Sequence, residues 1–357
     1  MNKQEKALEQ LRKMLDNKLF LPGSRLPTIL KLAEQFGLKE RPIRNAVKVL
    51  VNENKLYAVK GKGIFVTDPD VQNNKNIMFL VDSDYILNAN NQAENFFIQM
   101  EVYRGALAKA KKLGWTEIFY SFTGNIKDVI SEYRKKNCCA ILSMAVLSPQ
   151  QLNEISKHVG LHQLVDTQFD KPNYGYTEVR VDFECGEREI LEKAYELGHR
   201  NIAMLYGENF TECASHLERF HGFLTFCQKK NIVVTPASMI SSGGTELEAY
   251  KKANILLKSS PEVTLIFAVT DERAKGVLHA LKDREISAGK EISVIGFDNS
   301  PHAEELELAT VAVPRREVGV RAIEVMNKLL HSSQAKGYTE TLKSYPVLRS
   351  SLGPVCK

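Results

Sequence analysis

A group of cations and an amide near residue 44 has the chemistry to contact nucleic acid. In the segment ERPIRNAVKVL, apolar residues recur at i, i+3, i+4 and i+7, which predicts one buried helix face. The opposite face then presents Arg41, Arg44, Asn45 and Lys48. Guanidinium, ammonium and amide groups on one exposed face can bind phosphates and read base edges. For any single residue, an ordinary solvated face is the alternative explanation.

A basic turn follows this helix. Two short stretches of alternating apolar residues flank Lys60, Gly61, Lys62 and Gly63, and this pattern predicts two strands joined by a tight reversal. The turn lacks the length of a G-x-x-x-x-G-K-[ST] phosphate loop, and no helix follows it. We therefore interpret it as a basic wing beside the helix.

Two further helices must position this pair. An apolar stripe predicts the first over about residues 3–18, and a second stripe predicts a helix from about Pro27, in its first turn, to Phe36. Gly37 ends the second helix, so two helices of similar length are joined by a tight turn. Residues 1–67 are thus predicted to form a winged helix-turn-helix domain.

Charge is distributed unevenly along the chain. The 357 residues carry a net charge of +5, and residues 1–70 alone account for +6, which leaves −1 for the rest. A basic head on a near-neutral body is typical of a nucleic-acid-binding module attached to another domain. With 43% hydrophobic residues, the chain is long enough for two or three domains.

Several function classes are disfavoured by the sequence. No apolar run approaches the roughly 20 residues that a membrane helix needs, and the N-terminus lacks the apolar core of a secretory signal, so we expect a cytoplasmic protein without a membrane partner. The six cysteines show no metal-ligand spacing, which predicts neither zinc nor disulfides. No motif supplies a catalytic nucleophile, a metal or a nucleotide loop, so we expect neither an enzyme nor a cofactor.

Residues 68–75 are polar and aperiodic and are predicted to be a linker to a body spanning 76–357. In the body, apolar runs alternate with amphipathic helices, which predicts α/β architecture with doubly wound parallel sheets in two lobes. The expected strands lie near residues 76–84, 116–122, 138–144, 162–166, 201–206, 237–240, 263–269 and 291–298. We assign about 76–181 and 312–344 to lobe one, and about 182–311 and 345–352 to lobe two. Ligands of such folds bind between the lobes, at the carboxyl ends of the strands.

The head resembles the winged helix-turn-helix of the GntR family of bacterial transcription regulators. The resemblance rests on the PG-x-x-LP loop, the L-A-x-x-x-G-L and R-x-A-x-x-x-L helices and the G-x-G-x-F-V wing. It implies that Arg44 contacts DNA and that Lys60 with Gly61 enters the minor groove. The family's usual Ser-Arg pair is replaced here by Lys39 and Glu40, and Lys39 or Arg41 is the candidate to compensate.

The body resembles the LacI family effector domain, which is related to periplasmic sugar-binding proteins. The segments L-G-H-R-x-I, R-x-x-G-F and I-G-F-D occur in the family's order. The resemblance implies that Arg219, Asp298 and Asp166 bind the hydroxyls of a sugar. A guanidinium fork and a carboxylate suit pairs of hydroxyls. The alternatives are a surface position for Arg219 and a loop-capping role for Asp298.

Further candidates are expected around the same cleft. Asp82 and Ser83 end the first strand, and Phe96 or Phe97 could offer a ring face to a sugar, although such a ring is as often core. Thr270 stands where the family often has Asn. Arg315 could serve a phosphorylated sugar, but we favour a surface helix start for it.

Together these features predict a ligand-responsive bacterial transcriptional regulator, most simply a repressor. A homodimer would bind a pseudo-palindromic double-stranded operator, and a sugar or sugar phosphate in the cleft would release or remodel it. The alternatives are a sugar-binding transport receptor and a cytoplasmic sugar-acting enzyme.

Overall fold

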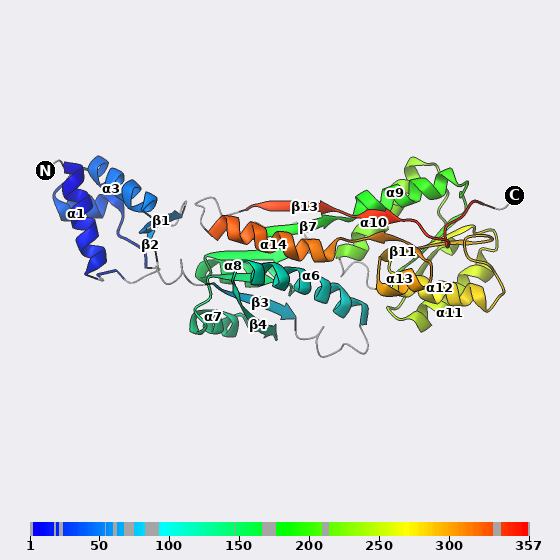
Figure 1. Cartoon of the computed structure of the whole chain (residues 1–357). Helices are drawn as coiled ribbons and strands as arrows, with labels where there is room; N and C mark the ends of the chain where they lie inside the picture. The colour runs from blue at the N-terminus through cyan, green and yellow to red at the C-terminus, as the bar shows by residue number, and fades with distance from the viewer. Residues whose placement is uncertain are drawn as a thin grey trace.

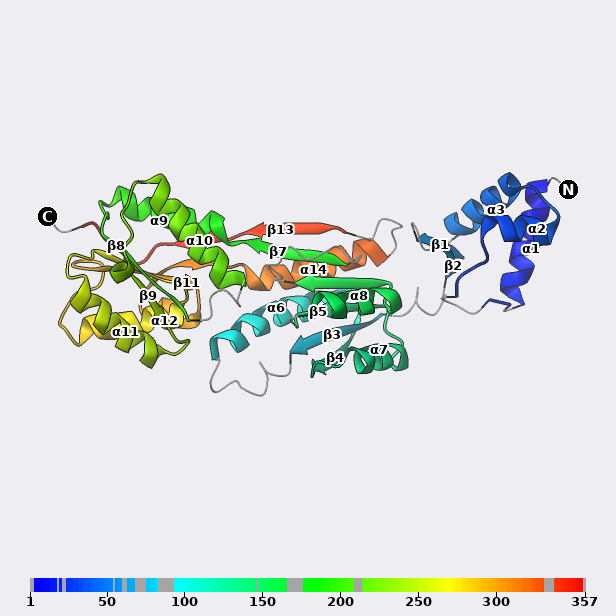
Figure 2. The ribbon, with the colours of Figure 1, turned by 180° about the vertical axis from the view of Figure 1, so that it is seen from behind.

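The computed structural model describes residues 3–17, 19–20, 24–53, 55–59, 63–67, 75–82, 93–145, 147–165, 176–208, 214–330 and 337–355, without the side chains of residues 59, 93–98 and 214. A small head lies at the N-terminal end, and two lobes built on six-stranded sheets form the body (Figure 1). Lobe one lies next to the head and lobe two at the far end, as the opposite view also shows (Figure 2).

The head has the predicted winged helix-turn-helix order. Its elements are α1 (Lys3–Asp16), α2 (Ile29–Phe36), α3 (Glu40–Asn52), β1 (Leu56–Val59) and β2 (Gly63–Val66). The Thr28 side chain accepts a hydrogen bond from the backbone N–H of Lys31, so α2 begins at Ile29 and the expectation that Pro27 lies inside its first turn is wrong. Gly37 ends α2 with φ of +62°, a conformation that glycine adopts without strain.

The apolar stripes of the head pack as their spacing predicts. Leu11 of α1, Leu32 of α2, and Ile43 and Leu50 of α3 are fully buried in one cluster. β1 and β2 pair antiparallel, with Leu56 opposite Val66. The three helices therefore fix the exposed face of α3.

Lobe one contains an all-parallel sheet flanked by helices. Its strands are β3 (Asn76–Asp82), β4 (Thr116–Phe122), β5 (Ala140–Ser143), β6 (Leu161–Val165), β7 (Thr177–Asp182) and β13 (Thr339–Lys343), in the order β13-β7-β6-β5-β3-β4. Its helices are α6 (Ala93–Lys112), α7 (Ile126–Lys135), α8 (Pro149–His158) and α14 (Arg315–Leu330). The predicted strand and helix alternation is confirmed, with β7 and β13 as additional strands.

Lobe two repeats the plan with one antiparallel strand at the edge. The order is β14-β12-β11-β10-β8-β9, with β8 (Ile202–Gly207), β9 (Met239–Ser242), β10 (Leu265–Ala268), β11 (Ser293–Asp298), β12 (Ala309–Ala312) and β14 (Tyr345–Val347). Only β14 runs against its neighbour among these pairs. The helical elements are α9 (Phe183–Glu196), α10 (Ala214–Lys229), the short 3₁₀ turn η1 (Pro236–Ser238), α11 (Glu246–Ser259), α12 (Asp271–Lys282) and α13 (Pro301–Glu305).

The chain passes between the sheets after β7, after β12 and after β13. Ser344, between β13 and β14, is buried and donates its hydroxyl to the carbonyls of Asp182 and Phe183, at 2.8 and 3.0 Å. It also accepts the N–H of Gly186 at 2.9 Å. The first and third crossings are therefore bonded to each other at the junction of the lobes.

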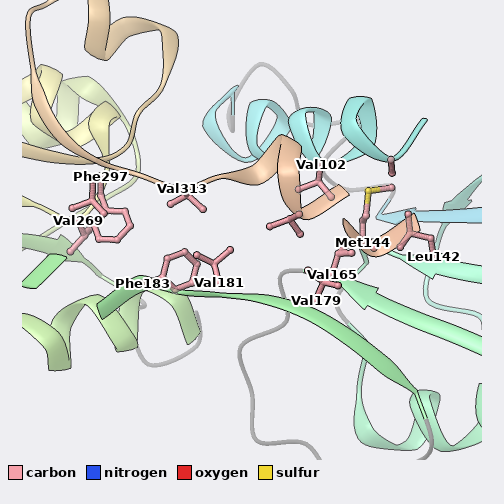
Figure 3. Close-up of a cluster of buried hydrophobic side chains, with 14 of the residues drawn as sticks. Val102, Leu142, Met144, Val165, Val179, Val181, Phe183, Val269, Phe297 and Val313 are labelled. Carbon is pink, nitrogen blue, oxygen red and sulfur yellow. The ribbon is translucent and has the colours of Figure 1, made fainter. Parts of the chain in front are cut away.

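An apolar cluster continues from one lobe into the other. Figure 3 shows Val181, Phe183 and Val313 of the crossings between Phe297 and Val269 of lobe two and the apolar side chains of lobe one. Phe183 meets Phe297 edge to face, with ring centroids 6.0 Å apart. The junction is thus a packed region, which limits the motions that the lobes can make.

Two glycines allow α6 and α14 to cross closely in lobe one. A Cβ on Gly105 would meet the carbonyl oxygen of Arg316 at 1.9 Å, and one on Gly319 would meet that of Val102 at 2.0 Å. Because no side chain separates the backbones here, α14 belongs mechanically to lobe one.

No helix within the described ranges is long and apolar enough to cross a membrane. Among the described residues, Cys138, Cys139, Cys185 and Cys227 are free and buried. Within the same ranges, no group of three or more His, Cys, Asp or Glu residues could hold a metal ion.

Candidate functional site

The α3 helix presents a stripe of cations to solvent. Arg41, Arg44 and Lys48 are exposed, which follows from the burial of Ile43, Ala46, Val47 and Leu50 on the other face. Arg44 pairs with Glu40 at 2.8 Å, one turn away. Asn45 is half-buried and donates to Gln4 of α1 at 3.4 Å, so it lies at the edge of the stripe. The stripe is therefore accessible to phosphates along its whole length.

The other head candidates lie at the ends of these elements. Lys39 precedes α3 and is exposed. Lys60, Gly61 and Lys62 lie outside the described residues. Arg25, which the sequence did not single out, pairs by backbone with Phe65 and places its guanidinium against Gly63 of β2. The sequence signal that could have identified Arg25 is its position next to the apolar residue Leu26, which is 2% exposed in the head core and holds this loop in place.

In lobe two, a buried carboxylate binds two arginines. Asp298 ends β11, and its Oδ1 accepts hydrogen bonds from Arg219 Nη2 and Arg315 Nη2, both at 2.9 Å. Arg219 Nη1 reaches Oδ2 at 3.3 Å, which makes this pair bidentate. Side-chain exposure is 2% for Arg219, 6% for Arg315 and 1% for Asp298. A surface position for Arg219 or Arg315, considered from the sequence, is therefore wrong.

The electrostatics of this triad favour the ionised form. Burial alone would raise the pKa of Asp298, but the guanidinium groups of Arg219 and Arg315 outweigh burial and hold that pKa well below its usual range. The Arg219 guanidinium carbon also lies 3.8 Å from the centroid of the Phe297 ring. Donors and a charged acceptor thus meet at the carboxyl end of β11, where hydroxyl groups could compete for them.

A second buried carboxylate lies beside the triad. Asp271, the first residue of α12, accepts hydrogen bonds from Ser300 N and Thr310 Oγ1, both at 2.6 Å. Burial, and then the negative charge of Asp298, raise the pKa of Asp271 to about 7, although its hydrogen bonds act in the opposite direction. Asp271 therefore changes protonation near neutral pH.

We predict that Asp271→Asn reduces the pH dependence of stability. Because the folded pKa of about 7 exceeds the usual value of 3.8, the wild-type free energy of unfolding should fall as pH rises between these two values. The fall is about 1.4 kcal/mol for each unit of pKa difference. An asparagine can accept from Ser300 and donate to Thr310, so it should keep both contacts without the titration. Urea denaturation at pH 4.5 to 7.5 measures how the free energy of unfolding changes with pH. An Asp271→Asn variant with the same pH dependence as the wild type would contradict the assignment. The control is Asp283→Asn on the surface, which should leave the pH dependence of the wild type unchanged.

Thr270 lies immediately before Asp271 and caps α12. Its hydroxyl accepts from Arg273 N at 3.3 Å and from Arg273 Nη1 at 3.2 Å. The structure therefore places Thr270 two residues beyond β10 and close to a buried cation that the sequence did not single out. Arg273 and Asp271 interrupt the buried stripe of α12, and a charged residue in such a stripe is the signal that could have identified both.

The remaining predicted residues are only partly described. Asp82 ends β3, at the carboxyl edge of the lobe-one sheet, and is half-buried. Ser83 and Asp166 lie outside the described residues, as do the side chains of Phe96 and Phe97. The described part of the site thus comes from lobe two, from Arg315 at the start of α14 and from Asp82 at the end of β3.

His199 of the L-G-H-R segment has a structural role. Its ring nitrogens contact Thr264 Oγ1 at 3.0 Å and the Gly353 carbonyl at 2.9 Å. Burial lowers the pKa of His199. This histidine ties the C-terminal segment to the lobe-two sheet, away from the triad.

Sequence comparison with known families agrees with this architecture. The profile of bacterial regulatory proteins of the gntR family matches residues 3–66, and that of the periplasmic binding protein-like domain matches residues 191–352. The chain thus joins a segment that matches the gntR-family profile to one that matches the periplasmic binding protein-like domain. The gntR-family match covers the stripe on α3, and the second match covers Arg219, Asp298 and Arg315.

Curated relatives share this arrangement over most of their length. The arabinose metabolism transcriptional repressor of Geobacillus stearothermophilus is 25% identical and aligns with 87% of this chain and 86% of its own length. That relative is a transcriptional repressor, which is the function class predicted from the sequence.

Solved structures support the fold of the body. A LacI family transcriptional regulator from Enterococcus faecium with bound ribose has a TM-score of 0.64 and 22% identity, over 79% of this chain and all of that one. The lac repressor dimer bound to operator and an anti-inducer also has a TM-score of 0.64, with 17% identity over 78% of this chain and 94% of its own. At these identities the likeness concerns the fold. The predicted two-lobed parallel-sheet fold of the body is thus confirmed.

Proposed function

We propose that this protein is a cytoplasmic, ligand-responsive transcriptional repressor that binds its operator as a homodimer. Residues 1–67 form the DNA-binding domain, and residues 76–357 form the domain that binds the effector. Residues 68–75 are the linker between the two domains. The observation that carries the proposal is the presence, on one chain, of an exposed cationic α3 and a buried Asp298 held by two arginines. The arabinose repressor relative and the ribose-bound and operator-bound neighbours support it.

On DNA, α3 enters the major groove. Arg41, Arg44 and Lys48 contact phosphates and base edges, with Lys39 and Asn45 at the margins of the helix, and the wing residues 60–62 reach toward the minor groove. Two heads of a dimer occupy half-sites about one helical turn apart, so the operator is pseudo-palindromic. Half-site spacing then depends on how the two bodies are arranged.

The effector binds between the lobes at the carboxyl ends of the strands. Its hydroxyls exchange hydrogen bonds with Arg219 and Asp298 of lobe two and with Arg315. The proposed site is completed by Thr270, Asp82, Ser83, Asp166 and Phe97. It is divided between lobe one, at about residues 76–181 and 312–344, and lobe two, at about residues 182–311 and 345–352. A sugar or a sugar phosphate fits this set, because most of it donates to or accepts from hydroxyls.

Effector binding is coupled to operator affinity because the triad of Arg219, Asp298 and Arg315 is divided between the two lobes. Arg315 begins α14 of lobe one, whereas Asp298 belongs to the sheet of lobe two. A ligand that competes for Asp298 changes how strongly the lobes are held together, and this change alters the dimer and the spacing of its heads. A tenfold weaker operator affinity requires only about 1.4 kcal/mol of such coupling.

The test combines operator binding with a ligand screen. Wild-type protein should select a pseudo-palindromic fragment from a random DNA library, and a sugar or sugar phosphate that raises the melting temperature should release that fragment. Binding that is insensitive to both salt and sequence would contradict the proposal.

We predict that Arg219→Ala abolishes the response to the effector without abolishing DNA binding. The substitution removes the fork that holds hydroxyls beside Asp298, while Arg315 still pairs with the carboxylate. Effector affinity should fall at least about 100-fold, as for a lost charged hydrogen bond in a buried site. Calorimetric titration and gel shifts measure the two properties separately, and an unchanged affinity would remove Arg219 from the site.

A further inference from the structure

A third buried arginine lies beyond the triad. Arg273 is 5% exposed, and its guanidinium donates to Thr270 Oγ1 at 3.2 Å and to the Ser242 carbonyl at 3.4 Å. A Cβ on Gly207 would lie 3.4 Å from Nη2, and one on Gly244 would lie 3.9 Å from it. The guanidinium therefore lies over the carboxyl ends of β8, β9 and β10, against glycines that leave their backbone uncovered.

His216 adjoins the same strand ends. Its Nδ1 lies 2.7 Å from the place that a Cβ on Gly207 would occupy, so Arg273 and His216 meet over one glycine. Burial, and then the charges of Arg219 and Arg273, lower the pKa of His216 to about 3, although the charge of Asp298 acts in the opposite direction. The guanidinium groups of Arg219 and Arg273 therefore both act on the His216 ring at these strand ends.

Arg219 connects this corner to the triad. It lies one helical turn after His216 on α10, and its Nε, although buried, has no hydrogen-bond partner among the described residues. The exposed Glu248 carboxylate interacts electrostatically with Arg273. It already accepts hydrogen bonds from Thr245 at the start of α11, and solvent screens its charge, so it does not neutralise Arg273. Strand ends lined by glycine and faced by arginines are suited to an anion.

We propose that the effector carries a phosphate group, which Arg273 and His216 bind at the ends of β8 and β9 while its hydroxyls occupy Arg219 and Asp298. This inference rests on the proposed function and makes it narrower: the effector is a phosphorylated sugar. Arg273 makes the site prefer a sugar phosphate to a free sugar. Its guanidinium group can donate two parallel hydrogen bonds to two phosphate oxygens, and a free sugar has no such pair of charged acceptors. His216 supplies one N–H beside them.

The test compares sugars with their own phosphate esters on the full-length protein. Calorimetric titration uses arabinose, ribose, glucose and fructose, the 5- or 6-phosphate of each, and inorganic phosphate with and without each free sugar. At least one ester should bind about tenfold or more tightly than its parent sugar. In Arg273→Gln the ratio of ester affinity to free-sugar affinity should fall to about one, and Arg273→Lys should keep part of the preference for the ester.

The control is Lys275→Gln, on the same helix and with the same charge change. Lys275 pairs with Glu246 at 2.7 Å, outside the corner, so the preference for the ester should persist. Operator binding by Arg273→Gln without ligand checks that the variant is folded.

Three results would overturn the inference. The first is a free sugar that binds as tightly as its ester and releases the operator, which would leave the proposed function intact. The second is an ester preference that survives Arg273→Gln, and the third is no binding of any ester at millimolar concentration. Tight phosphate binding that requires a separate free sugar would assign the corner to inorganic phosphate instead of a sugar phosphate. If ligands bind but none changes operator affinity, the proposed function itself fails.

Discussion

Replacing Asp298 with asparagine is expected to lower the free energy of unfolding of the body by about 3–5 kcal/mol. The carboxylate is 1% exposed and accepts from both Arg219 and Arg315, so its loss leaves two buried cations without their shared counter-charge. The neighbouring Asp271 already accepts from Ser300 and Thr310, and it cannot replace Asp298 without losing these contacts. Urea denaturation at pH 7, followed by circular dichroism, measures the loss.

Two variants show whether unpaired charge is the cause. Glu305→Gln removes an exposed carboxylate that lies 3.7 Å from His302, and it should change stability by less than about 0.5 kcal/mol. Combining Asp298→Asn with Arg315→Gln removes one of the stranded cations and should recover part of the loss. If the double variant is as unstable as the sum of its parts, the triad does not act as a unit.

The largest effect on DNA binding is expected from Arg41→Ala, Arg44→Ala and Lys48→Ala combined. If each cation neutralises one phosphate in each of two heads, the slope of log affinity against log salt should fall in magnitude by about 5. The loss in affinity at physiological salt should reach about a thousandfold or more, because phosphate contacts supply much of the binding. Fluorescence anisotropy on the selected operator, across a salt series, measures both quantities.

A matched variant separates contact from net charge. Lys251, Lys252 and Lys258 lie on α11, at the opposite end of the molecule from the head (Figure 1). Their replacement by alanine removes the same charge but should leave the salt slope unchanged. Equal losses in the two triple variants would mean that α3 does not lie on the phosphates.

The head was almost fully predictable because its signals are local. Helix faces such as Ile43 to Leu50 repeat within two turns, and the glycines of the wing mark the reversal. The apolar strands β3 to β6 and β8 to β11 were equally visible. The buried strands β7 and β12 and the edge strand β14 were not predicted. β13 was missed because its side chains alternate between exposed and half-buried, and it is placed by pairing with β7, far away in sequence.

The candidate site was predictable only where a segment resembled a family. Arg219 and Asp298 were found in this way, but Arg315, the second partner of Asp298, was assigned to the surface. Its burial depends on the crossing after β12, which brings the start of a lobe-one helix to the end of a lobe-two strand. Arg273 was missed because a cation in the first turn of an amphipathic helix usually meets solvent, although its position within the apolar stripe of α12 was a sign of burial.

The crossing of α6 and α14 at Gly105 and Gly319 gives the triad a mechanical meaning. Backbones in direct contact cannot slide past each other without steric overlap, so α6 and α14 must move together as one rigid unit. Arg315 is the first residue of α14, and its guanidinium group is hydrogen-bonded to Asp298. Small displacements at the carboxylate are therefore transmitted along about 20 Å of paired helix, toward the end of lobe one that faces the head.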